Sequence, residues 1–148
     1  MQDLRNSESN PRELSPAALA FIGDGVFELL ARELVLKNGT IPAHKMHRLA
    51  VQKVCAKAQA KAFSQLLPVL NEEEMRILKR GRNANSAHVP KNCSVMEYRK
   101  ATAVEALFGY LYLKGEIPRM IELFGMIEDS REAKHAEERK IKLQGDSP

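Results

Sequence analysis

Hydrophobic residues along the chain recur at the three- and four-residue spacing of helices, and cap residues mark where helices begin and end. Ser15 followed by Pro16 predicts a helix start, because a serine cap often precedes proline in the first turn. The apolar run that follows predicts a helix to Lys37, with Gly39 as the stop. A second helix is predicted from just after Pro42 to Pro68.

The middle of the chain predicts a short helix followed by a polar loop. Asn71 and Glu74 have the spacing of a capping box, in which each side chain satisfies the other residue's backbone N–H. Glycine disfavours helix continuation, so we expect this helix to stop at Gly81. Residues 82–93 are polar and include a proline, which predicts a loop.

The last third of the chain predicts two more helices. Ser94 and Glu97 form another capping box, and that helix is expected to end near Gly115. A final helix is predicted from about Pro118. No stretch alternates hydrophobic and polar residues with the period of a strand. The predicted fold class is therefore all-α, with about five main helices.

The 148 residues suit one domain with a sizeable core. We expect residues 1–13 to be a flexible N-terminus and residues 14–130 to form the domain. Residues 131–148 are expected to be a charged, loosely ordered end of the last helix.

Positive charge is concentrated in the middle of the chain. Residues 37–100 contain 13 Lys and Arg against 4 Asp and Glu, a net charge of +9, whereas the whole chain carries +4. Such a segment favours a polyanion such as nucleic acid, because cations that neutralise phosphates release counterions. Solvated helix faces would give the same charge pattern, and charge alone does not separate the two interpretations.

Other classes of protein are disfavoured. No apolar run approaches the 18 residues of a membrane span, and the charged start does not resemble a signal peptide, so we expect no membrane association. Cys55 and Cys93 are too few for a disulfide framework, which favours the cytoplasm. His44 and His47 lack cysteine partners at the spacing of a zinc site.

Two acids lie within apolar helices. Asp24 and Glu105 each occupy the middle of a segment that is hydrophobic nearly all round, so both are expected to be buried. A buried carboxylate without a partner costs several kcal/mol. Each acid therefore needs a cationic side chain, a proton or a metal ion.

Small residues near these acids would let two helices cross closely with both carboxylates facing one site. They are Gly23 and Gly25 beside Asp24, and Ala101, Thr102 and Gly109 around Glu105. Two converging carboxylates suit Mg²⁺, which prefers oxygen ligands and can activate water for attack on a phosphate. An ordinary buried ion pair, with Arg99 as partner for Glu105, stays open as the alternative.

Three separate motifs in this chain resemble those of the ribonuclease III family. Residues 21–26 (FIGDGV) resemble its signature helix, and residues 105–110 (EALFGY) resemble its second catalytic helix. The segments RGRNANS at 80–86, VPKN at 89–92 and YR at 98–99 resemble the Mini-ribonuclease III branch, which lacks a double-stranded-RNA-binding domain. The resemblance covers about residues 14–123.

This resemblance implies a helical homodimer that cleaves double-stranded RNA with Mg²⁺ and leaves 5′-phosphate and 3′-hydroxyl ends. For this branch it also implies maturation of the large-subunit ribosomal RNA precursor. Asp24 and Glu105 then correspond to the catalytic, metal-binding acids.

The chain departs from full-length family members at three positions where those enzymes carry further carboxylates. Here these positions hold Ala17, Ala20 and Thr102, which leaves the number of metal ions open. Glu28, one turn after Asp24, is either an outer residue of the site or an ordinary polar position.

Without a separate RNA-binding domain, the catalytic domain must hold its own substrate. Basic and polar residues of the predicted loop and its borders are candidates, since A-form duplexes are recognised through shape, phosphates and 2′-hydroxyls. These candidates are Lys79, Arg80, Arg82, Asn83, Asn85, Ser86, Lys91 and Arg99. A stripe of Lys53, Lys57 and Lys61 is a weaker candidate, with a solvated helix face as the alternative.

The main competing function is a non-catalytic RNA-binding domain that acts in ribosome or ribonucleoprotein assembly. Asp24 and Glu105 disfavour it, because two acids beside a phosphate-binding surface repel the ligand unless a cation lies between them.

Overall fold

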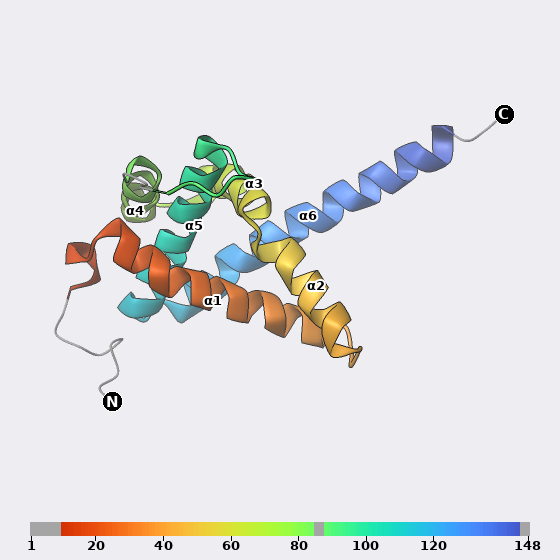
Figure 1. Cartoon of the computed structure of the whole chain (residues 1–148), viewed down its shortest axis with the longest axis horizontal. Coiled ribbons are helices and arrows are strands. Elements are labelled where there is room, and N and C mark those ends of the chain that lie inside the picture. The colour runs from red at the N-terminus through yellow and green to blue at the C-terminus, as the bar shows by residue number, and fades with distance from the viewer. Residues whose placement is uncertain (1–9, 85–87, 146–148) are drawn as a thin grey trace.

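The computed structural model describes residues 10–84 and 88–145, and in these ranges the chain is helical, with no strand (Figure 1). The elements are η2 (Pro11–Glu13), α1 (Pro16–Lys37), α2 (Ala43–Val54), α3 (Ala56–Leu66), η3 (Leu67–Val69), α4 (Glu72–Asn83), α5 (Val95–Lys114) and α6 (Ile117–Gly145). The predicted all-α fold class is confirmed.

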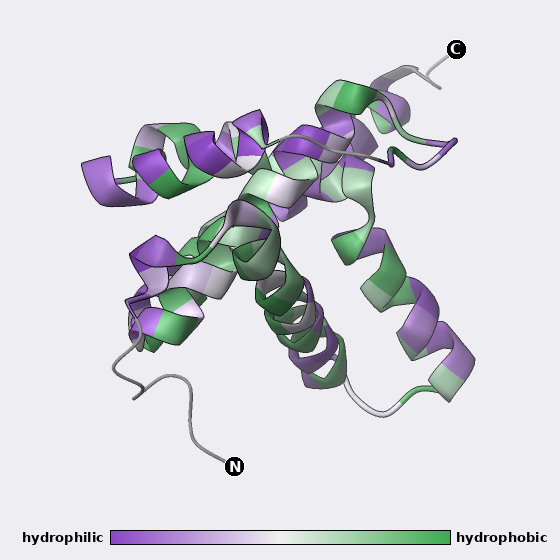
Figure 2. Ribbon diagram, turned by 60° about the vertical axis from the view of Figure 1, so that its left-hand side comes forward, coloured by the Kyte–Doolittle hydropathy of each residue, from purple (hydrophilic) through white to green (hydrophobic). Residues whose placement is uncertain are grey.

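Helix α5 is the centre of the fold. Ten of its residues are buried, and it packs most extensively against α1, then against α3 and α4 (Figure 1). The buried apolar residues of the surrounding helices form one cluster with those of α5. Figure 2 shows how hydrophobic and hydrophilic positions alternate along the helices. Phe27 of α1 lies edge-on to both Phe108 of α5 and Phe124 of α6, with ring centres 5.0 Å and 5.3 Å apart. This aromatic group joins three helices.

The predicted helix ends are confirmed where they depend on local chemistry. Ser15 accepts a hydrogen bond from the Ala18 N–H at the start of α1. Both capping boxes are present, with Asn71 and Glu74 at the start of α4 and Ser94 and Glu97 at the start of α5. Gly115 ends α5 in the left-handed conformation, with φ of 82°.

The single helix predicted from Pro42 to Pro68 is wrong, because the chain breaks into α2 and α3 at Cys55. Cys55 is extended, with ψ of 153°. Side chains from the middle of α6 hold this break. Arg131 donates to the Lys53 and Ala58 carbonyls at 3.3 Å and 3.1 Å, and Glu128 pairs with Lys53 at 2.6 Å. Carbonyls near a helix end need such partners.

The predicted stop at Gly81 is also wrong, since α4 continues to Asn83. Gly81 lies where α4 crosses α5, and a Cβ there would stand 2.7 Å from the Ala103 Cα. This glycine permits close helix packing and does not terminate the helix.

The chain's two ends bear on the predicted domain limits, which remain a prediction. Pro11–Glu13 form η2 within the segment expected to be flexible, and residues 1–9 lie outside the described ranges. Helix α6 extends away from the other helices, and residues 132–145 are exposed along it (Figure 1). Across the part of the chain that is described, no helix has both the length and the apolar character needed to cross a membrane.

Candidate active site

Helices α1 and α5 cross at a pair of glycines. A Cβ on Gly23 would lie 1.6 Å from the Glu105 carbonyl oxygen, and one on Gly109 would lie 2.0 Å from the Leu19 carbonyl oxygen. Both distances are far below any real contact, so only glycine allows the backbones to approach this closely. The crossing brings Asp24, the residue after Gly23, close enough to Glu105 for its negative charge to raise the pKa of the Glu105 carboxyl.

Asp24 is exposed in this chain, so the prediction that it is buried is wrong. The apolar residues around it include a face of α1 that no element of the described residues covers. Phe21 is 81% exposed, Leu29 58% and Leu36 59%, and a Cβ on Gly25 would meet nothing within 4 Å. A hydrophobic pattern cannot distinguish a face covered by its own chain from a face left open.

Glu105 is partly buried, and its environment disfavours the charged form. Burial, followed by the negative charge of Asp24, raises the pKa of the Glu105 carboxyl to about 7. The Gln59 side chain acts in the opposite direction and lowers this pKa. At neutral pH the Glu105 carboxyl is therefore close to half protonated when no cation is bound.

The alternative of an ordinary ion pair is not supported. Neither Asp24 nor Glu105 pairs with a Lys or Arg of the described residues, and the buried Nε of Arg99 has no hydrogen-bond partner there. No group of three or more His, Cys, Asp or Glu side chains gathers in the described ranges. The site thus consists of two carboxylates without a cation.

Comparisons with known proteins identify this arrangement. Residues 17–116, which contain both acids, match the model of the ribonuclease III domain. The chain is 42% identical over 114 residues to the Mini-ribonuclease 3 of Brevibacillus brevis, covering 77% of this chain and 85% of that protein. It is 44% identical over 121 residues to the Mini-ribonuclease 3 of a Thermoanaerobacter species, covering 79% and 85%. The chain belongs to the Mini-ribonuclease 3 branch of the ribonuclease III family.

A solved structure agrees with this assignment. The X-ray structure of a Fusobacterium nucleatum protein superposes with a TM-score of 0.74 at 31% identity, covering 84% of this chain and 99% of that one. The chain is thus an endoribonuclease of the ribonuclease III type, and Asp24 and Glu105 occupy the crossing of its α1 and α5.

Gln59 of α3 is a polar residue at the ribonuclease III site that the sequence analysis missed. Its side chain is 1% exposed, and its amide Nε2 has no hydrogen-bond partner among the described residues. A buried donor without an acceptor costs about 1–3 kcal/mol, so it calls for an explanation. A signal was present in the sequence, since Gln59 is an uncharged polar residue in the alanine-rich run AKAQAKA at 56–62.

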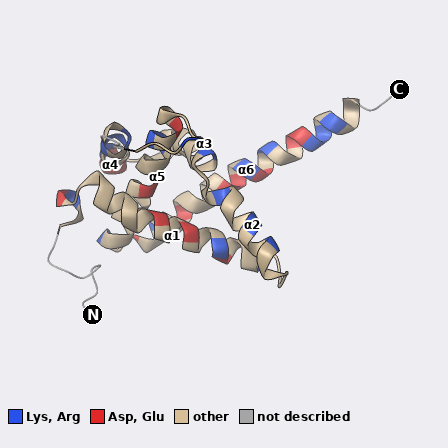
Figure 3. Cartoon of the chain, in the orientation of Figure 1, with Lys and Arg blue, Asp and Glu red and all other residues tan. Residues whose placement is uncertain are grey.

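Among the predicted RNA-binding residues of this Mini-ribonuclease 3, Lys79, Arg80, Arg82 and Asn83 lie at the end of α4, Lys91 lies in the connection to α5, and Arg99 lies in α5. Figure 3 shows where Lys and Arg positions lie along the ribbon. Lys79, Asn83 and Lys91 are exposed, and Arg82 is partly exposed. Asn85 and Ser86 lie outside the described residues. Lys79 and Lys91 are thus accessible to a phosphate backbone.

Arg80 differs from these residues because its guanidinium is used within the chain. It donates to the carbonyls of Arg12 at 3.2 Å and Leu14 at 3.1 Å, which attaches the segment before α1 to α4. Arg80 was predicted to bind RNA, but in this structure its guanidinium holds two backbone carbonyls of the same chain.

Two weaker candidates also have partners. Lys53 pairs with Glu128, whereas Lys57 and Lys61 of the same predicted stripe are exposed. Glu28 pairs with Arg32 on α1 at 2.8 Å. The Glu28 carboxylate is therefore engaged along its own helix.

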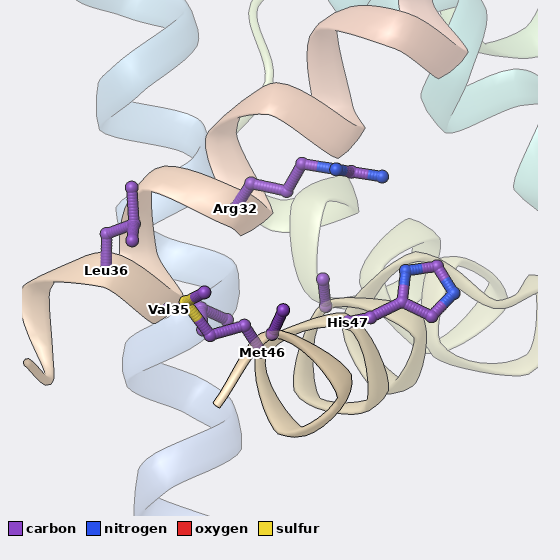
Figure 4. Close-up of a pocket in the computed structure, with 7 residues that line it drawn as sticks. Arg32, Val35, Leu36, Met46 and His47 are labelled. Carbon is purple, nitrogen blue, oxygen red and sulfur yellow. The ribbon is translucent and has the colours of Figure 1, made fainter. Parts of the chain in front are cut away.

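A pocket of about 290 Å³ lies between the C-terminal half of α1 and α2, away from the two acids (Figure 4). Val35, Leu36 and Met46 give it an apolar lining, and Arg32 and His47 lie at its edges (Figure 4). No carboxylate lines this pocket. It therefore lacks the carboxylate oxygens that Asp24 and Glu105 offer to a divalent metal.

Proposed function

We propose that this enzyme cleaves double-stranded RNA with the help of Mg²⁺ and leaves 5′-phosphate and 3′-hydroxyl ends. The observation that carries the proposal is the pair Asp24 and Glu105, placed side by side without a cationic side chain. Burial of the Glu105 carboxyl, followed by repulsion from the Asp24 carboxylate, raises the pKa of Glu105 to about 7. A bound divalent cation would relieve this repulsion.

The residues present fit such a cation. Asp24 and Glu105 supply the oxygen ligands that Mg²⁺ prefers, and Asp24 is open to the solvent and to substrate. When bound, the metal supplies a positive charge that activates water and stabilises charge developing on the phosphate. Asp24 and Glu105 hold and orient that charge, and Gln59 contributes to the charge balance of Glu105.

The substrate class follows from charge and exposure. Lys79, Arg82, Asn83 and Lys91 are at least partly accessible near the loop that connects α4 and α5, and the segment 37–100 carries a net charge of +9. We propose that these residues, with Asn85, Ser86 and Arg99, contact the RNA duplex, and that Arg80 acts mainly by attaching the segment before α1 to α4.

We further propose that the natural substrate is the precursor of large-subunit ribosomal RNA in the cytoplasm. The support is membership of the Mini-ribonuclease 3 branch, which the segments at 80–86, 89–92 and 98–99 also indicated. If this is correct, cells that lack the gene should accumulate that precursor with unprocessed ends, and the wild-type gene should restore the mature ends.

We propose that the enzyme is a homodimer. The uncovered face of α1, with Phe21, Leu29 and Leu36 exposed and Gly25 level with the surface, is an apolar area of the kind that partners bury. A second copy that covers this face would bring two Asp24–Glu105 sites into one particle. Phe21→Asp should yield monomers in analytical ultracentrifugation, whereas the wild type should sediment as a dimer.

The test of the reaction is cleavage of a long, perfectly paired RNA by the wild type and by Asp24→Asn, each with Mg²⁺ or EDTA. We expect Mg²⁺-dependent cleavage by the wild type and none by the variant, with equal helicity by circular dichroism. Cleavage that survives in the variant would contradict the assignment of the site. RNA binding without cleavage under any divalent metal would favour the non-catalytic role in ribosome assembly.

A further inference from the structure

Three polar side chains are buried in the described part of the chain, and they differ in their partners. Glu74 is 2% exposed and is paired with Arg119, and Glu128 is 6% exposed and is paired with Lys53 and Arg131. Gln59 is 1% exposed, and its Nε2 meets no acceptor among the described residues. Native interiors rarely leave a donor unpaired in this way, and the exceptions are often functional.

The position of Gln59 connects it to Glu105. Helix α3 packs along α5, and the Gln59 amide lies close enough to the Glu105 carboxyl to favour its charged form. The side chain is thus near its natural acceptor but does not complete a hydrogen bond with it. An N–H group is a donor only, so its nitrogen cannot be a ligand for a cation.

We propose that Gln59 is a positioning residue for the divalent metal of this enzyme: its amide donates to the Glu105 carboxylate and holds it in the orientation in which it binds the cation. This inference rests on the function proposed above. Carboxylates that bind metals are themselves commonly held by hydrogen bonds, and these outer partners affect metal affinity. The missing hydrogen bond at Gln59 is the one that the loaded site would complete.

A purely structural role for Gln59 makes a different prediction. If Gln59 only filled space or stabilised the core, its replacement would change stability without changing metal binding. If Gln59 positions Glu105, replacing it by an apolar side chain of similar length should weaken metal binding. The metal-free fold should stay intact, because the substitution also removes the buried donor that has no partner.

The experiment uses the full chain and Mn²⁺ as the probe. Gln59→Met is compared with Gln65→Met on the same helix, where a buried Oε1 is also without a partner. Mn²⁺ affinity is measured by electron paramagnetic resonance, and the melting temperature is measured in EDTA. We expect Gln59→Met to lower Mn²⁺ affinity by about 10–100-fold. Its melting temperature in EDTA should not fall below that of the wild type, and Gln65→Met should bind Mn²⁺ like the wild type.

The outcomes separate this inference from the function on which it rests. If the wild type does not bind Mn²⁺, both are overturned. If the wild type binds Mn²⁺ and Gln59→Met binds it equally well, the role of Gln59 alone is overturned. Should Gln59→Met fail to fold, Gln59→Asn keeps a buried amide but withdraws it by one methylene. It should also bind Mn²⁺ more weakly, and wild-type affinity in this variant would overturn the inference.

Discussion

Helix α5 contacts two groups of carboxylates that are treated in opposite ways. Beside its last turns, Glu73 accepts hydrogen bonds from Arg12, Tyr110 and Lys114. In the same cluster Glu74 accepts two from Arg119, at 2.8 Å and 3.0 Å. In the middle of the same helix, Glu105 and its neighbour Asp24 have no cationic partner among the described residues.

The pKa values record this difference. Hydrogen bonds from Tyr110, Arg12 and Lys114 lower the pKa of Glu73 to about 2. Burial acts to raise the pKa of Glu74, but the hydrogen bonds from Arg119 and from the Asn71 backbone outweigh it, and the pKa lies below its ordinary value. Glu105 is moved upward, to about 7. The acids paired with cations are thus those between helices of the fold, whereas the acids without cationic partners among the described residues are those of the proposed metal site.

The largest expected effect is at the site without cations. Glu105→Gln should reduce cleavage by more than the roughly 10–100-fold that loss of an outer hydrogen-bond partner typically costs, because it removes a proposed metal ligand. The same variant should be more stable than the wild type in EDTA at pH 8, by about 1–3 kcal/mol, since the charge that disfavours folding is gone. Cleavage assays test the loss of activity, and urea unfolding tests the gain in stability.

A loss of stability in Glu105→Gln would contradict the comparison, because it would mean that the acid holds the fold. Retained cleavage would contradict the assignment of Glu105 to the chemistry. A matched control is Glu122→Gln on α6, an exposed acid paired with Arg119, which should leave cleavage unchanged.

The next effect is at the cluster with cations. Arg119→Met would leave Glu74, whose side chain is 3% exposed, without its cation and would also remove a 2.8 Å hydrogen bond to the Val69 carbonyl. Breaking one partner of a buried pair costs about 3–5 kcal/mol. Urea unfolding should show a loss of this size, with the remaining folded enzyme still active.

The exposed pair of Arg32 and Glu28 provides the control for that measurement. Arg32→Met removes an ion pair one turn apart on α1, where the expected loss is only about 0.3–0.5 kcal/mol. Equal losses in the two variants would mean that burial does not set the strength of the Glu74 pair.

The sequence predicted those parts of the fold that depend on neighbours along the chain. The caps at Ser15, Asn71 and Ser94 involve residues three apart, and all are present. The break at Cys55 was not predictable in this way, because the groups that hold it come from Arg131 and Glu128 far along the chain. Gly81 likewise serves a crossing with α5, which local glycine statistics do not reveal.

The candidate site was predicted to a similar extent. Apolar surroundings singled out Asp24 and Glu105, and small neighbours indicated a close crossing, which Gly23 and Gly109 form. Exposure of Asp24 was not predictable, because one sequence does not show which apolar face is left without cover. Gln59 approaches Glu105 only through the packing of α3 on α5.

The dependence of stability on pH should have opposite signs in the two groups. The pKa of Glu105 is higher in the folded chain than in the unfolded one, so its contribution is fully present below about pH 4.5 and is lost as the pH rises through about 7. In EDTA this should lower the free energy of unfolding by about 3 kcal/mol between pH 4.5 and 8. Urea unfolding across this range measures the loss, and Glu105→Gln should flatten it.

Glu73 gives the opposite slope. Its pKa is lower in the folded chain, so its contribution is present above about pH 4.5 and is lost as the pH falls toward 2. Glu73→Gln should flatten the acid side of the profile and leave the slope between pH 5 and 8 unchanged. If Glu73→Gln changed the slope between pH 5 and 8, or Glu105→Gln changed the slope below about pH 4.5, the two groups of carboxylates would not act independently.

The smallest expected effect concerns two basic residues of α4. Arg80 has hydrogen-bond partners within the chain, whereas Arg82, two residues later, is largely without them in the described ranges. Arg80 is held by the carbonyls of Arg12 and Leu14, whereas Arg82 contacts only the neighbouring Asn83 side chain, at 3.2 Å, among the described residues. Arg82→Ala should weaken RNA binding several-fold and reduce the slope of log affinity against log salt by about 1, as loss of one phosphate contact does. Arg80→Ala should mainly lower the melting temperature, because it releases the segment before α1. Salt titrations of binding to a catalytically inactive background, with melting curves for both variants, separate the two. If Arg80→Ala changed the salt slope and Arg82→Ala did not, the arginine held by the chain would be the one that contacts RNA, and exposure would not identify the binding residues.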